Sequence, residues 1–439
     1  MAISGWFVLV LAVGAVPLIA IGEWWVLPAW IACCLLLGAL DLLLAASPRA
    51  VRVDREVPAR VRLGDSVRAT VRIQNAGRRT MRALVRDGWP PSVQARPGRH
   101  RVVVPPGERR TLTASLTPFR RGSRPAADVT IRSFGPMRLA ARQASLRAPA
   151  TLLVLPPFHA RRHLPSRLAR LRELDGSTSV MVRGQGTEFD SLRGYVRGDD
   201  VRSIDWRASA RRPTALADRG DPDLVVRTWR PERDRRVVVI VDSGRTAAAR
   251  VGDETRLDTG YESALLLGAL ASAGGDRVDL VIHDRRVRGR VQGATGAALL
   301  SRMVDAMAAV EPELLESDWT ALPGLVRSAT SHRALVVLAT TPESPAAARG
   351  LLAVLPELAR KHLVLVAAVE DPAVAAATSE RARPSEVYLA AAAERALADR
   401  TALAAAVRRL GGDWVSGPPA ELPPAVADRY LDYKASGRL

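Results

Sequence analysis

One segment of the chain concentrates the residue types that carry out chemistry. It reads "RGYVRGDDVRSIDWRASARR" (193–212) and contains Asp199, Asp200 and Asp205 among arginines, one tyrosine and one tryptophan. Clustered carboxylates can hold a metal ion for hydrolysis, whereas carboxylates paired with arginines brace an irregular segment. Trp, Tyr and Arg also dominate protein-binding surfaces. The segment by itself leaves these three interpretations open.

The elements around this segment begin with two apolar runs at residues 5–22 and 24–46, separated by Glu23. Each run has about the length needed to cross a hydrocarbon core, and so short a linker predicts an antiparallel transmembrane hairpin over 1–48. Asp41 is the carboxylate inside the second run, and its place near the helix end makes it tolerable there. We expect it to play no part in a proton relay.

The formal net charge of +19 is concentrated directly after the hairpin. Residues 49–150 contain 23 arginines and six acidic residues, a net charge of +17. Arginines next to a membrane span favour the cytoplasmic side, so we expect two spans with the soluble domains in the cytoplasm. The basic domain then meets anionic lipid of the inner leaflet. Nucleic acid is not expected, because aromatic residues make up only 4% of the chain and offer few stacking platforms.

Hydrophobic periodicity divides the rest of the chain. Residues 49–155 alternate apolar and polar positions in short runs separated by Gly and Pro, which predicts an antiparallel, Ig-like β-sandwich. Continuous apolar strands in 236–439 are separated by helical stretches such as 260–274 and 295–310, which predicts a doubly wound parallel sheet with helices on both faces. The predicted fold class is therefore α+β multidomain, with the charged segment lying within 156–235.

The charged segment resembles the signature of the domain-of-unknown-function family numbered fifty-eight, in the stretch "GQGTEFDSLRGYVRGDDVRSIDWRASAR" (184–211). The residues that carry the resemblance are Glu188, Phe189, Leu192, Arg193, Tyr195, Gly198, Asp199, Asp200, Arg202, Ile204, Asp205, Trp206, Ala208, Ser209, Ala210 and Arg211. The resemblance implies a bacterial membrane protein with a von Willebrand factor A-like domain over 236–439. It also implies a partnership with a MoxR-type AAA+ ATPase in the assembly of other proteins.

Such A-like domains can hold a divalent ion through Asp-x-Ser-x-Ser, a distant Thr and a distant Asp. Here the first motif reads "DSGRT", with Asp242 and Thr246 kept and Gly244 in place of a serine, and Thr320 is the candidate distant threonine. Threonines follow the strand after which the distant aspartate is expected. Hard cations need several oxygen ligands in one place, so we expect no cofactor and no tight Mg²⁺ binding.

We interpret the charged segment mainly as a brace, in which Asp199 and Asp205 pair with arginines while Trp206 and Tyr195 are buried. The arginines expected to form these pairs are Arg193, Arg202 and Arg211. A partner-docking surface is compatible with the brace. The predicted function is a membrane-anchored, non-enzymatic adaptor for the ATPase. The alternative is a metal-dependent hydrolase with a site built on Glu188, Asp199 and Asp205.

Overall fold

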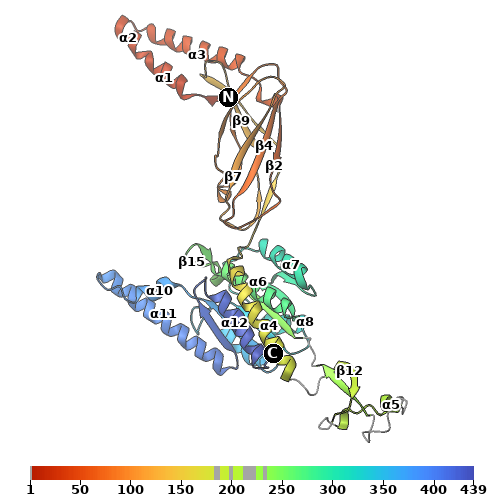
Figure 1. Cartoon of the computed structure of the whole chain (residues 1–439). Coiled ribbons are helices and arrows are strands. Elements are labelled where there is room, and N and C mark those ends of the chain that lie inside the picture. Colours follow the sequence, from red (N-terminus) through yellow and green to blue (C-terminus); the bar gives the residue numbers. More distant parts are fainter. Residues whose placement is uncertain (1, 182–187, 197–200, 211–223, 231–234) are drawn as a thin grey trace. The chain divides into compact units, whose positions relative to one another are not determined.

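The computed structural model describes residues 2–181, 188–196, 201–210, 224–230 and 235–439. The chain divides into two compact units, Met1–Pro157 and Phe158–Leu439. Each unit has its own sheets and its own hydrophobic core (Figure 1).

Two apolar helical segments begin the first unit. The first consists of α1 (Gly5–Val13) and α2 (Ala15–Ile21), and the second is α3 (Val26–Leu44). The segments touch, because the indole Nε1 of Trp30 donates to the carbonyl oxygen of Val10 at 3.2 Å. Among the described helices, the stretch that begins with α3 is long and apolar enough to cross a membrane, while the α1–α2 segment is shorter than that length.

The rest of the first unit is built from strands arranged in three sheets. Their orders are β1-β10-β9-β5-β6, β2-β4-β7 and β3-β11-β8. The strands are β1 (Ala2–Ile3), β2 (Val51–Glu56), β3 (Arg60–Arg62), β4 (Val67–Asn75), β5 (Met81–Arg86), β6 (His100–Val104), β7 (Arg109–Leu116), β8 (Gly122–Pro125), β9 (Val129–Phe134), β10 (Ala140–Leu146) and β11 (Thr151–Leu155). Pairing is antiparallel except between β11 and β3, which are parallel, so the expectation of a wholly antiparallel domain is wrong at that pair.

Alternation along the strands produces the core of this domain. In β4 the side chains of Ala69, Val71 and Ile73 are buried, and the residues between them are partly or fully exposed. Successive side chains of a strand point to opposite faces, so one face of β4 turns inward. Ile73 and Val71 join Met81 and Ile131 of the facing sheet in a single apolar cluster. The period-two pattern of the sequence therefore corresponds to a real packed interface between two sheets.

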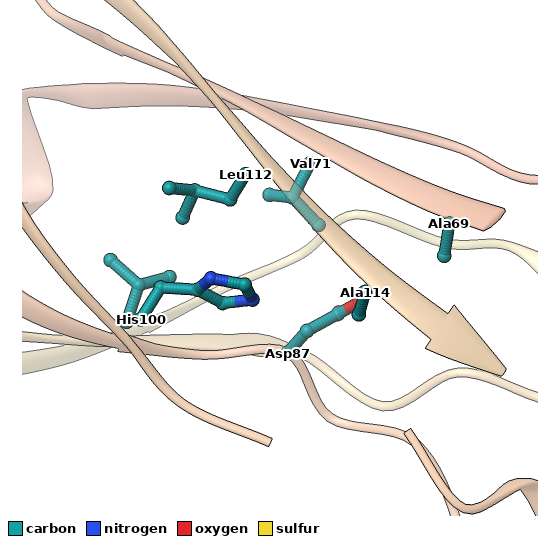
Figure 2. Close-up of a pocket in the computed structure, with 7 residues that line it drawn as sticks. Ala69, Val71, Asp87, His100, Leu112 and Ala114 are labelled. Atoms are coloured by element: carbon teal, nitrogen blue, oxygen red, sulfur yellow. The ribbon is translucent and has the colours of Figure 1, made fainter. Parts of the chain in front are cut away.

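A charged pair lies inside this domain. Asp87 accepts hydrogen bonds from Arg55 Nε at 3.0 Å and from the indole of Trp89 at 2.7 Å, and the Arg55 side chain is fully buried. Figure 2 shows Asp87 and His100 pointing into the space between the sheets, toward Val71 and other apolar side chains. This space has no room for a water molecule, so it is packed interior rather than a ligand site.

Asp41 joins α3 to the strands. Its side chain is fully buried and accepts three backbone N–H groups of the β9–β10 turn, those of Met137 at 2.8 Å, Leu139 at 2.8 Å and Ala140 at 2.9 Å. Gly135 in the same turn has no room for a Cβ, because the carboxylate and carbonyl of Asp41 would meet it. The acidic residue of the apolar run is thus a docking residue, and its charge is satisfied by the turn that it contacts.

Further bonds hold the helices at the same end of the strands. Arg142 Nε donates to the carbonyl oxygen of Leu42 at 2.9 Å, and Arg79 donates to that of Leu43 at 2.6 Å. The last carbonyls of a helix have no intrahelical partner, so these arginines cap α3. At the other terminus, β1 adds an edge strand to β10 immediately before α1 begins. The first apolar segment therefore begins, and the second ends, beside the β9–β10 turn of the sandwich.

The second unit is built around a six-stranded sheet with the order β18-β17-β14-β19-β20-β21. Its strands are β14 (Arg236–Asp242), β17 (Arg277–His283), β18 (Val287–Val291), β19 (Ala334–Ala339), β20 (Leu363–Val369) and β21 (Asp413–Gly417). All neighbours are parallel except β17 and β18. The sheet is therefore mixed, and the expectation of a purely parallel sheet is wrong at its β18 edge.

Helices cover both faces of this sheet. The group that contains α6 consists of α4 (Leu164–Met181), α6 (Arg256–Ala273), α7 (Gly296–Ala308) and α12 (Leu422–Ala435). The group on the opposite face consists of α8 (Leu322–Ala329), α9 (Arg349–Ala359) and α11 (Pro384–Arg409), and a short helix, α10 (Pro372–Ala377), packs on α11. Because both faces of the sheet are covered, the central strands are buried along nearly their whole length.

Candidate functional site

The charged segment is carried by a two-stranded hairpin, β12 (Glu188–Gly194) and β13 (Val225–Arg230). Between the strands lie a 3₁₀ turn at Val201–Ser203 and one helical turn, α5 (Trp206–Ser209). The backbone N–H of Asp205 donates to Val225 at 2.8 Å, which fixes the start of α5 on β13. The described part of the segment is therefore a hydrogen-bonded turn that is attached to two paired strands.

Asp205 organises this turn. Its carboxylate caps α5 by accepting the backbone N–H groups of Arg207 and Ala208, both at 3.0 Å, and forms an ion pair with Arg227 at 2.8 Å. The N–H of Ala208, followed by the Arg227 guanidinium, holds the pKa of Asp205 below its ordinary value. The sequence predicts that Arg193, Arg202 and Arg211 pair with the carboxylates of this segment. The structure adds Arg227 of β13, which the prediction did not include and which the bridge between Ile204 and Val226 brings beside the cap.

Ser209 completes the brace. Its hydroxyl donates to the carbonyl oxygen of Asp205 at 2.8 Å and accepts the backbone N–H of Val225 at 2.9 Å. One side chain thus links the end of α5 to the first residue of β13. This serine belongs to the predicted set, and it joins Asp205 in one network.

Trp206 contradicts the sequence-based expectation of burial. Its side chain is 67% exposed, whereas Tyr195 is only half-exposed. Val196, Val201 and Leu192 of the same hairpin are exposed as well. Asp205 caps α5, and Trp206, the first residue of that helix, is exposed, whereas Ile204, Val225 and Val226 are buried. The hairpin therefore presents an apolar surface held on a braced turn.

The other predicted residues are placed only in part. Glu188, Phe189 and Arg193 lie on β12, opposite Arg230, Trp229 and Val226. Arg202 lies in the 3₁₀ turn and is exposed. Four predicted residues lie outside the described residues: Gly198, Asp199, Asp200 and Arg211.

A second polar centre lies at the carboxyl ends of the parallel strands of the six-stranded sheet. Asp242 ends β14, and its carboxylate accepts the Thr340 hydroxyl at 2.7 Å, the Thr246 hydroxyl at 3.4 Å and the backbone N–H of Gly244 at 2.8 Å. The hydroxyl of Ser317 donates to it as well. Both oxygens of Asp242 are therefore engaged by groups from three separate loops.

One expectation about this centre needs correction. Thr320, the expected distant threonine, donates to Asp318 at 2.6 Å instead, and Ser317 occupies the corresponding place beside Asp242. Gly244 lacks the serine hydroxyl, as the sequence predicts, and the structure also leaves no room for a side chain at this position. A Cβ there would lie 2.8 Å from the carbonyl oxygen of Leu315 and against the Ser317 hydroxyl. The loop that carries Ser317 therefore fills the space that a side chain at residue 244 would need.

Asp284, at the end of the neighbouring strand β17, is buried next to this centre. It pairs with Arg288 at 3.0 Å and accepts the Ser243 hydroxyl at 3.1 Å and the backbone N–H of Arg286 at 3.1 Å. Burial opposes ionisation of Asp284, but these donors outweigh it and hold its pKa below the ordinary value. Asp284 is therefore a charged, paired group that supports the loops.

The residues of this centre do not fit a divalent cation. Hard cations take six or more oxygen ligands with several carboxylates free to point inward. Here Asp242 is saturated by hydroxyl and N–H donors, and Asp284 is paired with an arginine. Within the described part of the chain, no group of three His, Cys, Asp or Glu side chains is placed to hold a metal. The arrangement ties the loops at this edge of the sheet to one another.

The loop that closes the centre is apolar on its outer side. The side chain of Leu314 is 76% exposed, and that of Leu315 is exposed as well. The backbone holds this loop in place, since the N–H of Arg245 donates to Leu315 at 2.8 Å and that of Glu313 donates to Ser243 at 2.9 Å. Beside these leucines, Arg245 pairs with Glu316 at 2.8 Å. The edge therefore presents leucines framed by charges.

Three mycobacterial relatives share part of this chain. "Uncharacterized protein Mb1516" of Mycobacterium bovis and "Uncharacterized protein Rv1480" of Mycobacterium tuberculosis are each 26% identical to it over 181 residues. The alignment spans 41% of this chain and 44% of each relative, so the chain matches less than half the length of these curated proteins.

Solved structures give only weak likenesses. The CARDB domain of the PF1109 protein from Pyrococcus furiosus is 17% identical with a TM-score of 0.18, over 24% of this chain and 91% of that chain. Native α-2-macroglobulin from Escherichia coli is 20% identical with a TM-score of 0.21, over 25% of this chain and 17% of that chain. These TM-scores are too low to carry a conclusion.

A family model matches the part of the chain that holds both centres. Residues 191–377 contain the described braced turn around Asp205 and the hydroxyl-ringed Asp242. The region is similar to the family described as "Protein of unknown function DUF58".

Proposed function

We propose that this chain is a membrane-anchored, non-enzymatic adaptor that works with a MoxR-type AAA+ ATPase in the assembly of other proteins. In this proposal its interaction modules are the β12–β13 hairpin and the von Willebrand factor A-like region over 236–439. The ATPase partner comes from the family resemblance.

The observation that carries the proposal is the exposed Trp206 on its braced turn. A tryptophan held by a cap and an ion pair presents a large apolar surface at little cost in conformational entropy, which is typical of a binding hot spot. The centre at Asp242 supports the same interpretation. Its polar groups satisfy one another, while Leu314 projects outward from the loop above them. Such an edge suits a protein partner better than a small substrate.

Anchoring in a membrane is the second part of the proposal. More than half of the exposed large apolar side chains among the described residues lie before residue 45. A surface of this kind is unfavourable in water and suits lipid. We propose two antiparallel spans, both soluble units on the cytoplasmic side, and contact with anionic lipid of the inner leaflet. A reporter that is active only outside the cytoplasm, fused after Leu439, should be inactive; strong activity would overturn this topology.

The alternative, a metal-dependent hydrolase, gains no support from the described carboxylates. Asp205 is committed to a helix cap and an arginine, and Asp242 to a ring of donors. A catalytic carboxylate needs a free oxygen directed at substrate or metal. Calorimetric titration of the full chain with Mg²⁺ and Mn²⁺ discriminates the two functions, since the adaptor should give no saturable heat.

The direct test compares two exposed aromatic side chains. Trp206→Ala should weaken binding of the full chain to a MoxR-type ATPase by at least tenfold while thermal unfolding stays unchanged. Tyr388→Ala is the matched control, because Tyr388 is 79% exposed on α11 and lies outside the family-matched region. Equal affinities for the parent and both variants would refute the role of Trp206.

A further inference from the structure

Six arginines from four separate segments gather at the end of the sandwich from which α3 leaves. We call them the arginine collar: Arg49, Arg78, Arg79, Arg109, Arg110 and Arg138. All six are exposed. Their segments lie around residues 47–50, 75–80, 105–110 and 135–139 in the sequence, so the collar exists only in the folded chain.

Backbone bonds bring these segments together. The N–H of Ala76 donates to Ala50 at 2.9 Å, and the N–H of Asn75 donates to Glu108 at 3.0 Å. The Asp41 carboxylate holds the fourth segment through Met137. The turns that carry the arginines are therefore tied to one another and to the end of α3.

The collar has little internal compensation. Glu108 is the acidic residue in these four segments, and it pairs with Arg110 at 2.6 Å. Arg79 donates to the carbonyl of Leu43, which leaves its charge uncompensated. Among the described residues, no acidic side chain pairs with Arg49, Arg78, Arg109 or Arg138. Like charges that share one rim without counter-ions favour an anionic ligand.

The apolar surface next to the arginine collar indicates which class of anion the collar binds. The side chain of Leu43 is 64% exposed, and those of Leu40 and Leu44 are exposed beside it. Met137, next to Arg138 in the β9–β10 turn, is also exposed. An apolar band thus meets a cationic band within one turn of helix. Lipid has the complementary order, since its apolar chains meet anionic phosphates over a similar distance. A free phosphate or a nucleic acid would leave the apolar band in water.

We infer that the arginine collar binds the headgroup phosphates of anionic lipids around the end of α3, so that the sandwich meets the bilayer by this end. The inference rests on the membrane anchoring proposed above and narrows it. The sequence predicts that the whole basic domain lies on lipid. The contacts of Asp41 and β1 hold one end of the sandwich against the apolar helices. The arginines at the opposite end of the sandwich lie about 20 Å from this end, at the usual rise per residue of a strand.

Two variants with equal loss of charge test this inference. The collar variant R49Q/R78Q/R109Q/R138Q keeps Arg79, which caps α3, and Arg110, which is paired. The matched control R68Q/R86Q/R99Q/R101Q removes four exposed arginines further from α3. Each full-length chain is purified in neutral detergent, and native mass spectrometry measures its affinity for phosphatidylglycerol, phosphatidylcholine and inorganic phosphate. Thermal unfolding shows whether each variant is folded. If the quadruple collar variant does not fold, the single variants R109Q and R138Q are measured in its place.

We expect the parent to prefer phosphatidylglycerol over phosphatidylcholine and not to bind inorganic phosphate. The collar variant should lose at least tenfold of that preference, since each arginine beside anionic lipid contributes about fivefold in affinity. The control should stay within twofold of the parent. An equal loss of phosphatidylglycerol preference in both variants would overturn the collar, because lipid binding would then depend only on the total charge of the domain. Binding of inorganic phosphate with the affinity of the lipid would also overturn it. Membrane anchoring is judged separately, from retention of the chain in membranes after an alkaline wash.

Discussion

The bonds of Asp41 make a strong prediction about the joint between α3 and the sandwich. Asp41→Ala removes a carboxylate that accepts three backbone N–H groups. A hydrogen bond to a charged group contributes about 1.5–3 kcal/mol, and a buried donor left without a partner costs about 1–3 kcal/mol. The N–H of Leu139 is buried, whereas those of Met137 and Ala140 are partly buried and can turn to water. We therefore expect a loss of about 3 kcal/mol rather than the full sum.

Hydrogen exchange of the full chain in detergent measures this loss where it occurs. A change of about 3 kcal/mol in local opening corresponds to roughly a hundredfold faster exchange of the amides of Met137, Leu139 and Ala140. Asp54→Ala is the control, because Asp54 is an exposed acid on the outer side of β2. Gly135→Ala should loosen the same turn from the other side, since its Cβ has no room beside Asp41. Unchanged hydrogen exchange of these amides in Asp41→Ala would show that Asp41 does not hold α3 on the sandwich.

Three other predictions concern stability and metal binding. Asp87→Ala leaves the fully buried Arg55 without its counter-charge and should lower the free energy of unfolding by about 3–5 kcal/mol, measured with denaturant; a loss below about 1 kcal/mol would contradict the pair. Burial, with a smaller effect of the Glu262 and Asp258 carboxylates, raises the pKa of Glu254 to about 7 from 4.5. The stabilisation from protonated Glu254 is complete below pH 4.5 and is lost as the pH rises through 7, so Glu254→Gln should unfold at a higher temperature than the parent at pH 8 and at nearly the same temperature at pH 5. Gly244→Ser restores the missing serine of the metal motif but collides with the loop at Leu315, so it should lower the melting temperature and still give no Mg²⁺ heat in calorimetry; saturable binding would show that the loop moves aside.

Local sequence patterns were enough to predict the kinds of elements. Runs dominated by Val, Leu, Ile and Ala form the buried strands β14, β17, β19 and β20, because strands covered on both faces need mostly apolar side chains. Alternating runs became sandwich strands with one face inward, as in β4. The density of charge around Asp205 also marked a region that the family model matches. These are local properties, and local patterns are visible in the sequence.

Which side chains meet depends on the folded chain and could not be predicted from the sequence. Asp242 and Thr340 are 98 residues apart, and the choice of Ser317 over Thr320 depends on how one loop closes across the strand ends. Asp41 meets a turn almost a hundred residues away. Trp206 is an amphipathic residue whose burial depends on the direction that a helix cap gives it, and no periodicity records that direction. Partners brought together by folding are fixed by packing and backbone pairing over the whole unit, so the sequence named candidates and the fold selected among them.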